Sequence, residues 1–133
     1  MVLTSTPKGA LAVWSEGDKL LARALDQDAH PGLETWIVGY GRSTALASFG
    51  DGAVAVFTGQ DGTASNQVLA VKLGPTGTPS AKGIRLTDTG STKDPPAVVA
   101  VGARVGFMWT EPMTQGVGTK RALLRTIEAA CIP

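Results

Sequence analysis

The stretches "TALASFGDGAVAVF" (44–57) and "PAVVAVGARVGFMW" (96–109) superimpose without a gap, and this is the strongest match between any two segments of the chain. The superposition places Gly50 over Gly102 at an offset of about 52 residues, in the range typical of repeat architectures. In each copy, small and apolar residues alternate on both sides of a glycine turn, and a large aromatic residue ends the second run. Each copy therefore predicts two antiparallel strands joined by a tight turn.

A third copy of the second strand lies near the N-terminus, in "GALAVWSE" (9–16). It aligns Trp14 with Phe57 and Trp109, at offsets of about 43 and about 52 residues. In the same frame, "VLTS" (2–5) takes the place of a first strand. We expect the three aromatic side chains to fill the space between neighbouring sheets.

The segments that follow also align, namely "LLARALDQDAHPG" (20–32), "VLAVKLGPTGTPS" (68–80) and "ALLRTIEAACIP" (122–133). Leu, Ala, Arg and Lys in the first and third of these would favour a helix. The second, however, alternates as a strand does and ends in a Gly/Pro turn. The repeat therefore predicts a third strand in all three places.

A fourth strand completes two of the units, at "LETWIVG" (33–39) and "KGIRLTD" (82–88), whereas in the last unit it is missing or reduced to "CIP" (131–133). The polar link "TGSTKDPP" (89–96) cannot continue a ladder and suits a crossing between sheets. The prediction is an all-β chain of about eleven strands in four-stranded meanders. The three units span about residues 2–40, 44–88 and 96–133.

Composition sets the class of protein. The chain has 133 residues, of which 43% are hydrophobic and 17% charged, enough for one folded repeat domain. The net charge of +1 offers no field for nucleic acid or an anionic membrane, and the apolar runs fall short of a membrane span. We expect no secretory signal in "MVLTSTPKG" (1–9). The single cysteine, Cys131, cannot form an internal disulfide.

Two longer segments, "AVGARVGFMWTE" (100–111) and "IRLTDTGSTKDPPAV" (84–98), resemble the blades of bacterial β-propeller repeat proteins. In pattern they are similar to the sialidase-like and FG-GAP-like branches. The sialidase Asp-box has the form Ser-x-Asp-x-Gly-x-x-Trp, and "SFGDGAVAVF" (48–57) lacks it. The resemblance thus implies β-propeller blades and a secreted or cell-envelope protein, and it carries over no sialidase residue.

Three blades make an open arc, whereas propellers close with 4–8 blades. Each end blade would expose an apolar face that requires a partner. Two copies related by a two-fold axis would complete a six-bladed ring, so we expect a homodimer. The alternatives are that the chain is one part of a longer propeller, or that its strands form a compact sandwich or barrel.

Few residues have the chemistry of a site, and the sequence predicts no catalytic residue, no cofactor and no metal. Glu16 and Glu111 occupy matching positions, where they could bind a cation or a sugar hydroxyl or could simply face solvent. The segment "DQDAH" (26–30) begins like a calcium loop but lacks the glycine and the final glutamate of that pattern. It predicts an Asp-rich turn, and its lone His30 has no partner at zinc-ligand spacing.

Departures from the repeat are the better candidates for a site, because packing needs only the repeat while a ligand needs particular groups. Arg42 stands where the third unit has Asp94, and Trp36 and Tyr40 have no aromatic counterparts. The same frame places Arg104 on the same rim. These residues predict either a ligand site or a structural pair between Arg42 and Asp94.

The sequence therefore predicts a non-enzymatic binding module that takes a carbohydrate or a protein, with its ring completed by a second chain. One alternative is an enzyme of glycoside-hydrolase type that uses carboxylates and arginines around the channel. The other is a purely structural assembly protein.

Overall fold

The computed structural model describes residues 1–60, 66–88, 93–113 and 118–133, and over these ranges the chain is all-β, as predicted. Ten strands and one short 3₁₀ helix, η1, are formed within them. Their bounds are β1 (Val2–Thr6), β2 (Gly9–Glu16), β3 (Lys19–Leu25), β4 (Trp36–Phe49), β5 (Gly52–Gly59), β6 (Gln67–Leu73), β7 (Ile84–Arg85), β8 (Ala97–Val101), β9 (Arg104–Pro112), β10 (Lys120–Glu128) and η1 (Ala129–Cys131). No helix in the described ranges is long and apolar enough to cross a membrane.

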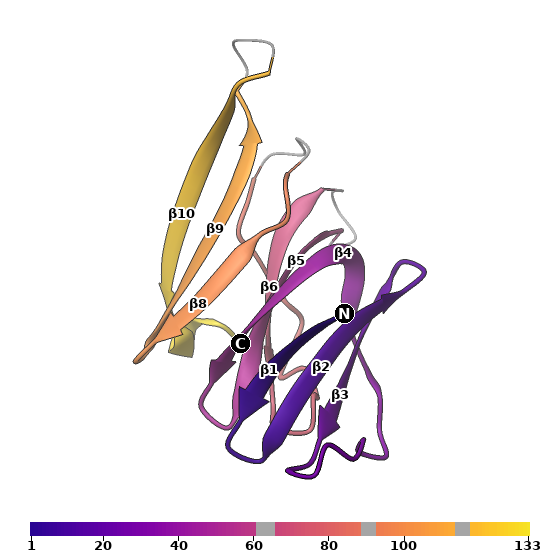
Figure 1. Cartoon of the computed structure of the whole chain (residues 1–133). Helices are drawn as coiled ribbons and strands as arrows, with labels where there is room; N and C mark the ends of the chain where they lie inside the picture. The colour runs from indigo at the N-terminus through magenta and orange to yellow at the C-terminus, as the bar shows by residue number, and fades with distance from the viewer. Residues whose placement is uncertain (61–65, 89–92, 114–117) are drawn as a thin grey trace.

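All strand pairs are antiparallel, and within each sheet every strand pairs with its neighbours in sequence. Strands β1 to β7 form one seven-stranded sheet in consecutive order, and β8 to β10 form a second sheet. The seven-stranded sheet is open, with β1 and β7 at its edges. Figure 1 shows β8–β10 on one side of β5 and β6, and β1–β3 on the other.

The long strand β4 joins two parts of the seven-stranded sheet. Its N-terminal part pairs with β3 and its C-terminal part with β5, and the register shifts between Arg42 and Ala45. Ser43, inside this bulge, has a positive φ of 58°. Since β-bulges bend a strand and increase its twist, the sheet can turn here. The two strands predicted at 33–39 and 44–49 are therefore one strand, so ten strands replace the predicted eleven.

The bend divides the seven-stranded sheet into two layers, and the second sheet forms a third layer. We call β1–β3 with residues 36–40 of β4 the first layer, residues 41–49 of β4 with β5–β7 the second layer, and β8–β10 the third layer. One apolar core lies between the first and second layers and includes Leu11, Val13 and Phe57. Another lies between the second and third layers and includes Val56 and Phe107. The second layer is thus buried on both faces, which explains why β5 and β6 are almost wholly buried.

The three aligned aromatic residues differ in their burial. Phe57 is 1% exposed in the core that faces the first layer, and Trp109 is 6% exposed in the core that faces the second. Trp14 is half-buried and shares a cross-strand row with Leu21 and Ile37. Ile37 is 48% exposed, so this row lies on the outer face of the first layer. The expected packing between sheets is confirmed for two of the three aromatics.

The fourth-strand positions also differ from the prediction. The strand predicted at 82–88 is formed only at Ile84–Arg85. The end of the last unit forms η1, after which Ile132 is buried in the second core. The predicted crossing at 89–96 joins strands of different sheets, but its residues 89–92 lie outside the described ranges.

Candidate functional site

A polar cleft of about 610 Å³ opens at one end of the strands of the first and second layers. It lies among the β2–β3 turn, the bend of β4, the end of β5 and the segment before β8. Its polar lining combines hydroxyl, amide, cationic and carboxylate groups. The polar and charged lining residues are Asp18, Tyr40, Arg42, Ser43, Thr58, Gln60, Asn66 and Lys93.

A second, more apolar hollow of about 790 Å³ adjoins this cleft. The two share Asp18, Tyr40 and Gln60 in their linings. The second hollow is also lined by Phe57 and Leu69 of the first core. Tyr40, which is 44% exposed, therefore stands between a hydrogen-bonding surface and an apolar one. Binding sites for small molecules commonly combine these two surfaces.

The shape of the cleft depends on a close approach between β4 and β5. Gly41 pairs directly with Gly59, and both line the cleft. A Cβ at Gly41 would lie 2.2 Å from the carbonyl oxygen of Thr58, and one at Gly59 would lie 2.1 Å from that of Tyr40. Glycine is therefore needed on both strands, because any side chain would force the backbones apart.

Two charged residues, Lys93 and Glu111, are buried, and Lys93 also lines the cleft. The Glu111 side chain is 4% exposed and accepts hydrogen bonds from Arg121 Nη2 at 2.5 Å and Nε at 3.0 Å. Lys93 is 7% exposed, and burial lowers its pKa, although the negative charge of Glu111 opposes that shift. The expectation of a solvated Glu111 is therefore wrong, because the Arg121 guanidinium compensates its burial.

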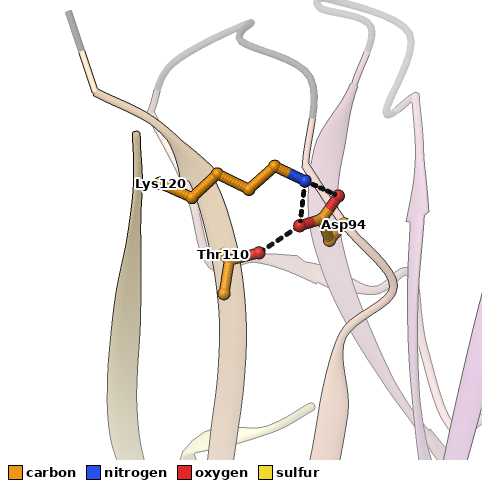
Figure 2. A network of polar contacts seen from close by, with 3 residues as sticks. All are labelled: Asp94, Thr110 and Lys120. Atoms are coloured by element: carbon orange, nitrogen blue, oxygen red, sulfur yellow. Dashed lines mark hydrogen bonds and ion pairs between the residues drawn. The ribbon is translucent and has the colours of Figure 1, made fainter. Parts of the chain in front are cut away.

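Asp94, next to Lys93, is the centre of a polar network (Figure 2). Its carboxylate accepts hydrogen bonds from Lys120 Nζ at 2.8 and 2.9 Å, and a further one from the Thr110 hydroxyl. These contacts tie the segment before β8 to β9 and β10. The Lys120 hydrogen bond, followed by that of Thr110, holds the pKa of Asp94 below its usual value.

The Asp94 network predicts an acid-sensitive contribution to stability. An unfolded aspartate has a pKa of about 3.9, and the folded value is lower, so the unfolded state takes up the proton first as the pH falls. The stabilisation is present above about pH 4 and is lost as the pH falls through the folded pKa. We expect Asp94→Asn to show a smaller drop in urea midpoint between pH 6 and pH 3 than the wild type.

Lys120→Met removes the main partner of Asp94 and should reduce the acid-dependent drop in the same way. Equal drops in the wild type and in both variants would show that the Asp94 network does not contribute to acid sensitivity.

The structure brings together only part of the predicted site. Tyr40 and Arg42 line the cleft. Glu16 pairs with Lys19 on β3, and Lys19 pairs with Tyr40 on β4, so Glu16 and Tyr40 lie in the same cross-strand row. Trp36 is absent from both linings, and its indole N–H is buried without a partner among the described residues. The predicted pair of Arg42 with Asp94 is replaced by the pair of Lys120 with Asp94.

Arg104 does not share the rim of the cleft, so this prediction is wrong. It lies at the β8–β9 turn, at the opposite end of β9 from Thr110, and its Nε contacts Glu128 Oε1 at 2.8 Å. The physical reason is that β8 and β9 are antiparallel, so the turn between them lies at the other end of β9 from Thr110, which contacts Asp94. Arg104 is six positions from Thr110 along the strand, or about 20 Å.

Asp18, Gln60 and Lys93 are among the lining residues that were not predicted. Asp18 and Gln60 lie just outside strands, and Lys93 lies in the segment before β8. A polar residue outside a strand was the only signal for each of them in the sequence, and turns throughout the chain share that signal.

The Asp-rich turn at 26–30 forms as predicted. The side chain of Asp26 accepts hydrogen bonds from the backbone N–H groups of Asp28 and His30. The ligand atoms of Asp26, Asp28 and His30 lie within 4.8 Å of one another, and all three residues are exposed. These hydrogen bonds account for the geometry as an Asx-type turn.

Fold and cleft together define an all-β protein of packed antiparallel sheets with a polar cleft at the strand ends. Comparisons with protein-family models, with curated proteins and with solved structures found no match.

Proposed function

We propose that the chain is a non-enzymatic β-propeller-type module that binds a carbohydrate in the cleft at the strand ends. The arrangement around Tyr40 carries the proposal, because a polar cleft and an apolar hollow adjoin there. A sugar ring has hydroxyls at its edges and C–H groups on its faces, so it suits a site with both surfaces. An aromatic side chain beside hydrogen-bonding groups is a common way to provide them.

The propeller interpretation is supported by the way the layers repeat. The first and second layers each place a hairpin and a third strand in the same order along the chain, and β8–β10 follow that order. The first layer buries an apolar face against the second, and the second buries one against the third. In this interpretation the layers are blades, and the cleft lies at the blade ends, where length changes in loops are tolerated.

A panel of oligosaccharides, screened by tryptophan fluorescence and followed by calorimetric titration, tests the proposal. Arg42→Ala should weaken binding of the best oligosaccharide about tenfold or more, because a hydrogen bond to a charged group is lost. Lys8→Ala is the control, since it removes a cation from the β1–β2 turn at the opposite strand end. Equal affinities for both variants and the wild type, or no binding across the panel, would contradict the proposal.

The enzyme alternative is tested with chromogenic glycosides in the same experiment. Glycoside hydrolysis requires two carboxyl groups about 5–10 Å apart. Within the described residues that line the cleft, Asp18 is the one carboxylate. Turnover by the wild type that is lost in Asp18→Asn would favour the enzyme. If the cleft binds a protein and no sugar, the chain is still a binding module, but its ligand is a protein.

A further inference from the structure

The three layers repeat in register as well as in sequence. On one face of each layer lies a row of three cross-strand partners at matching positions, which we call the forward row. The forward rows are Val2–Val13–Ala22 in the first layer, Ala45–Val56–Ala70 in the second and Ala97–Met108–Leu124 in the third. Because direct partners in an antiparallel pair project from the same face, each row marks one face of its layer.

The forward faces of two layers are buried by the layer that follows. In the first layer, Val13 lies in the core shared with the second layer. In the second layer, Val56 lies in the core shared with the third. In the third layer, Met108 and Leu124 are 51% and 74% exposed, because no described layer follows. Val99 and Val101, on the same face, are 57% and 71% exposed.

We call the face of each layer opposite its forward row the rear face. Phe57 on the rear face of the second layer packs against the first layer, and Trp109 on the rear face of the third packs against the second. Their counterpart Trp14 lies on the rear face of the first layer, which no described layer precedes. Leu3 and Ile37 on that face are 57% and 48% exposed. The chain thus ends in two faces of opposite kinds, each with large exposed apolar side chains, and the Arg104–Glu128 pair lies in the Val101 row of the forward face.

We infer that these end faces are covered by a second copy of this chain, with the forward face of each third layer packed on the rear face of the partner's first layer. The two seams inside the chain already join a forward face to a rear face, so the new seam continues an interface that the chain makes twice. A two-fold axis relating the copies makes both new seams identical and closes a ring of six layers. The inference rests on the propeller interpretation in the proposed function, but not on its carbohydrate ligand.

Light scattering after size exclusion tests the inference on the whole chain. At two concentrations, the wild type should have twice the 13.6 kDa mass of one chain. Met108→Glu and Leu124→Glu each place a carboxylate in the seam, where it would be buried without a partner, and both should reduce the mass to that of one chain. Met113→Glu is the matched control, because Met113 is also an exposed methionine but lies beyond the end of β9.

Circular dichroism shows whether the variants keep the β fold, and Leu124, as the more exposed of the two, should tolerate the change without unfolding. A wild-type mass of one chain would overturn the inference, and so would a mass that grows with concentration or a Met108→Glu variant that keeps the double mass. If a single-chain particle binds carbohydrate, the inferred dimer is overturned and the proposed ligand is kept. A double-mass particle that binds no carbohydrate would overturn only the proposed ligand.

Discussion

Replacement of Phe57 by alanine is expected to lower the free energy of unfolding by about 3–5 kcal/mol. The ring is 1% exposed in the core between the first and second layers. It packs so closely on β4 that a Cβ at Gly39 would lie 2.6 Å from its Cζ atom. The surrounding strands cannot close the cavity left by the ring, because β4 and β5 are held by their ladder.

Phe49→Ala is the matched control for Phe57→Ala. Phe49 is only half-buried, and Lys72 Nζ lies 5.9 Å from the centre of its ring. Its removal should therefore destabilise the protein much less. Urea unfolding followed by circular dichroism measures both variants, and equal losses would show that the core between the first and second layers does not hold the fold together.

The second large effect is expected for Gly41→Ala. The added methyl group would meet the Thr58 carbonyl oxygen at 2.2 Å, so β4 and β5 must separate, at a cost of about 1–3 kcal/mol. Gly74→Ala is the control, because its Cβ would lie 3.6 Å from its nearest neighbour, an ordinary contact. The same urea measurement compares the two variants. Equal stability would contradict the close approach that shapes the cleft.

Much of the fold was predictable, because strand signals and the repeat support each other. The segments 19–25 and 120–128 contain many helix-favouring residues, yet both form strands, as their alignment with β6 predicted. The continuous course of β4 was not predictable. The residues at 40–43, "YGRS", have the composition of a turn, whereas Gly41 provides close packing against β5 and Ser43 occupies a bulge.

The candidate site was only partly predictable. Tyr40 and Arg42, which departure from the repeat singled out as candidates, line the cleft. Lys93 and Gln60 could not be identified, because their positions in the cleft depend on the arrangement of the strands in space. The burial of Glu111 depends on its cross-strand pairing with Arg121, which is a matter of register between β9 and β10. Alignment of positions places residues along a strand but does not determine their partners across it.

A mixing experiment tests whether the two end faces differ and whether each packs on the other. Leu3→Lys alters only the rear face of the first layer, and Met108→Glu alters only the forward face of the third. Each variant alone has two altered seams and should show the mass of one chain by light scattering. The mixed dimer has one unaltered seam, and in its other seam the two new charges are opposite.

We predict that the two variants, once mixed, give a particle of twice the single-chain mass that neither forms alone. A Leu3→Lys variant that keeps the double mass by itself would contradict the inference, because like faces would then be pairing with each other. A mixture that stays at the mass of one chain would contradict it as well.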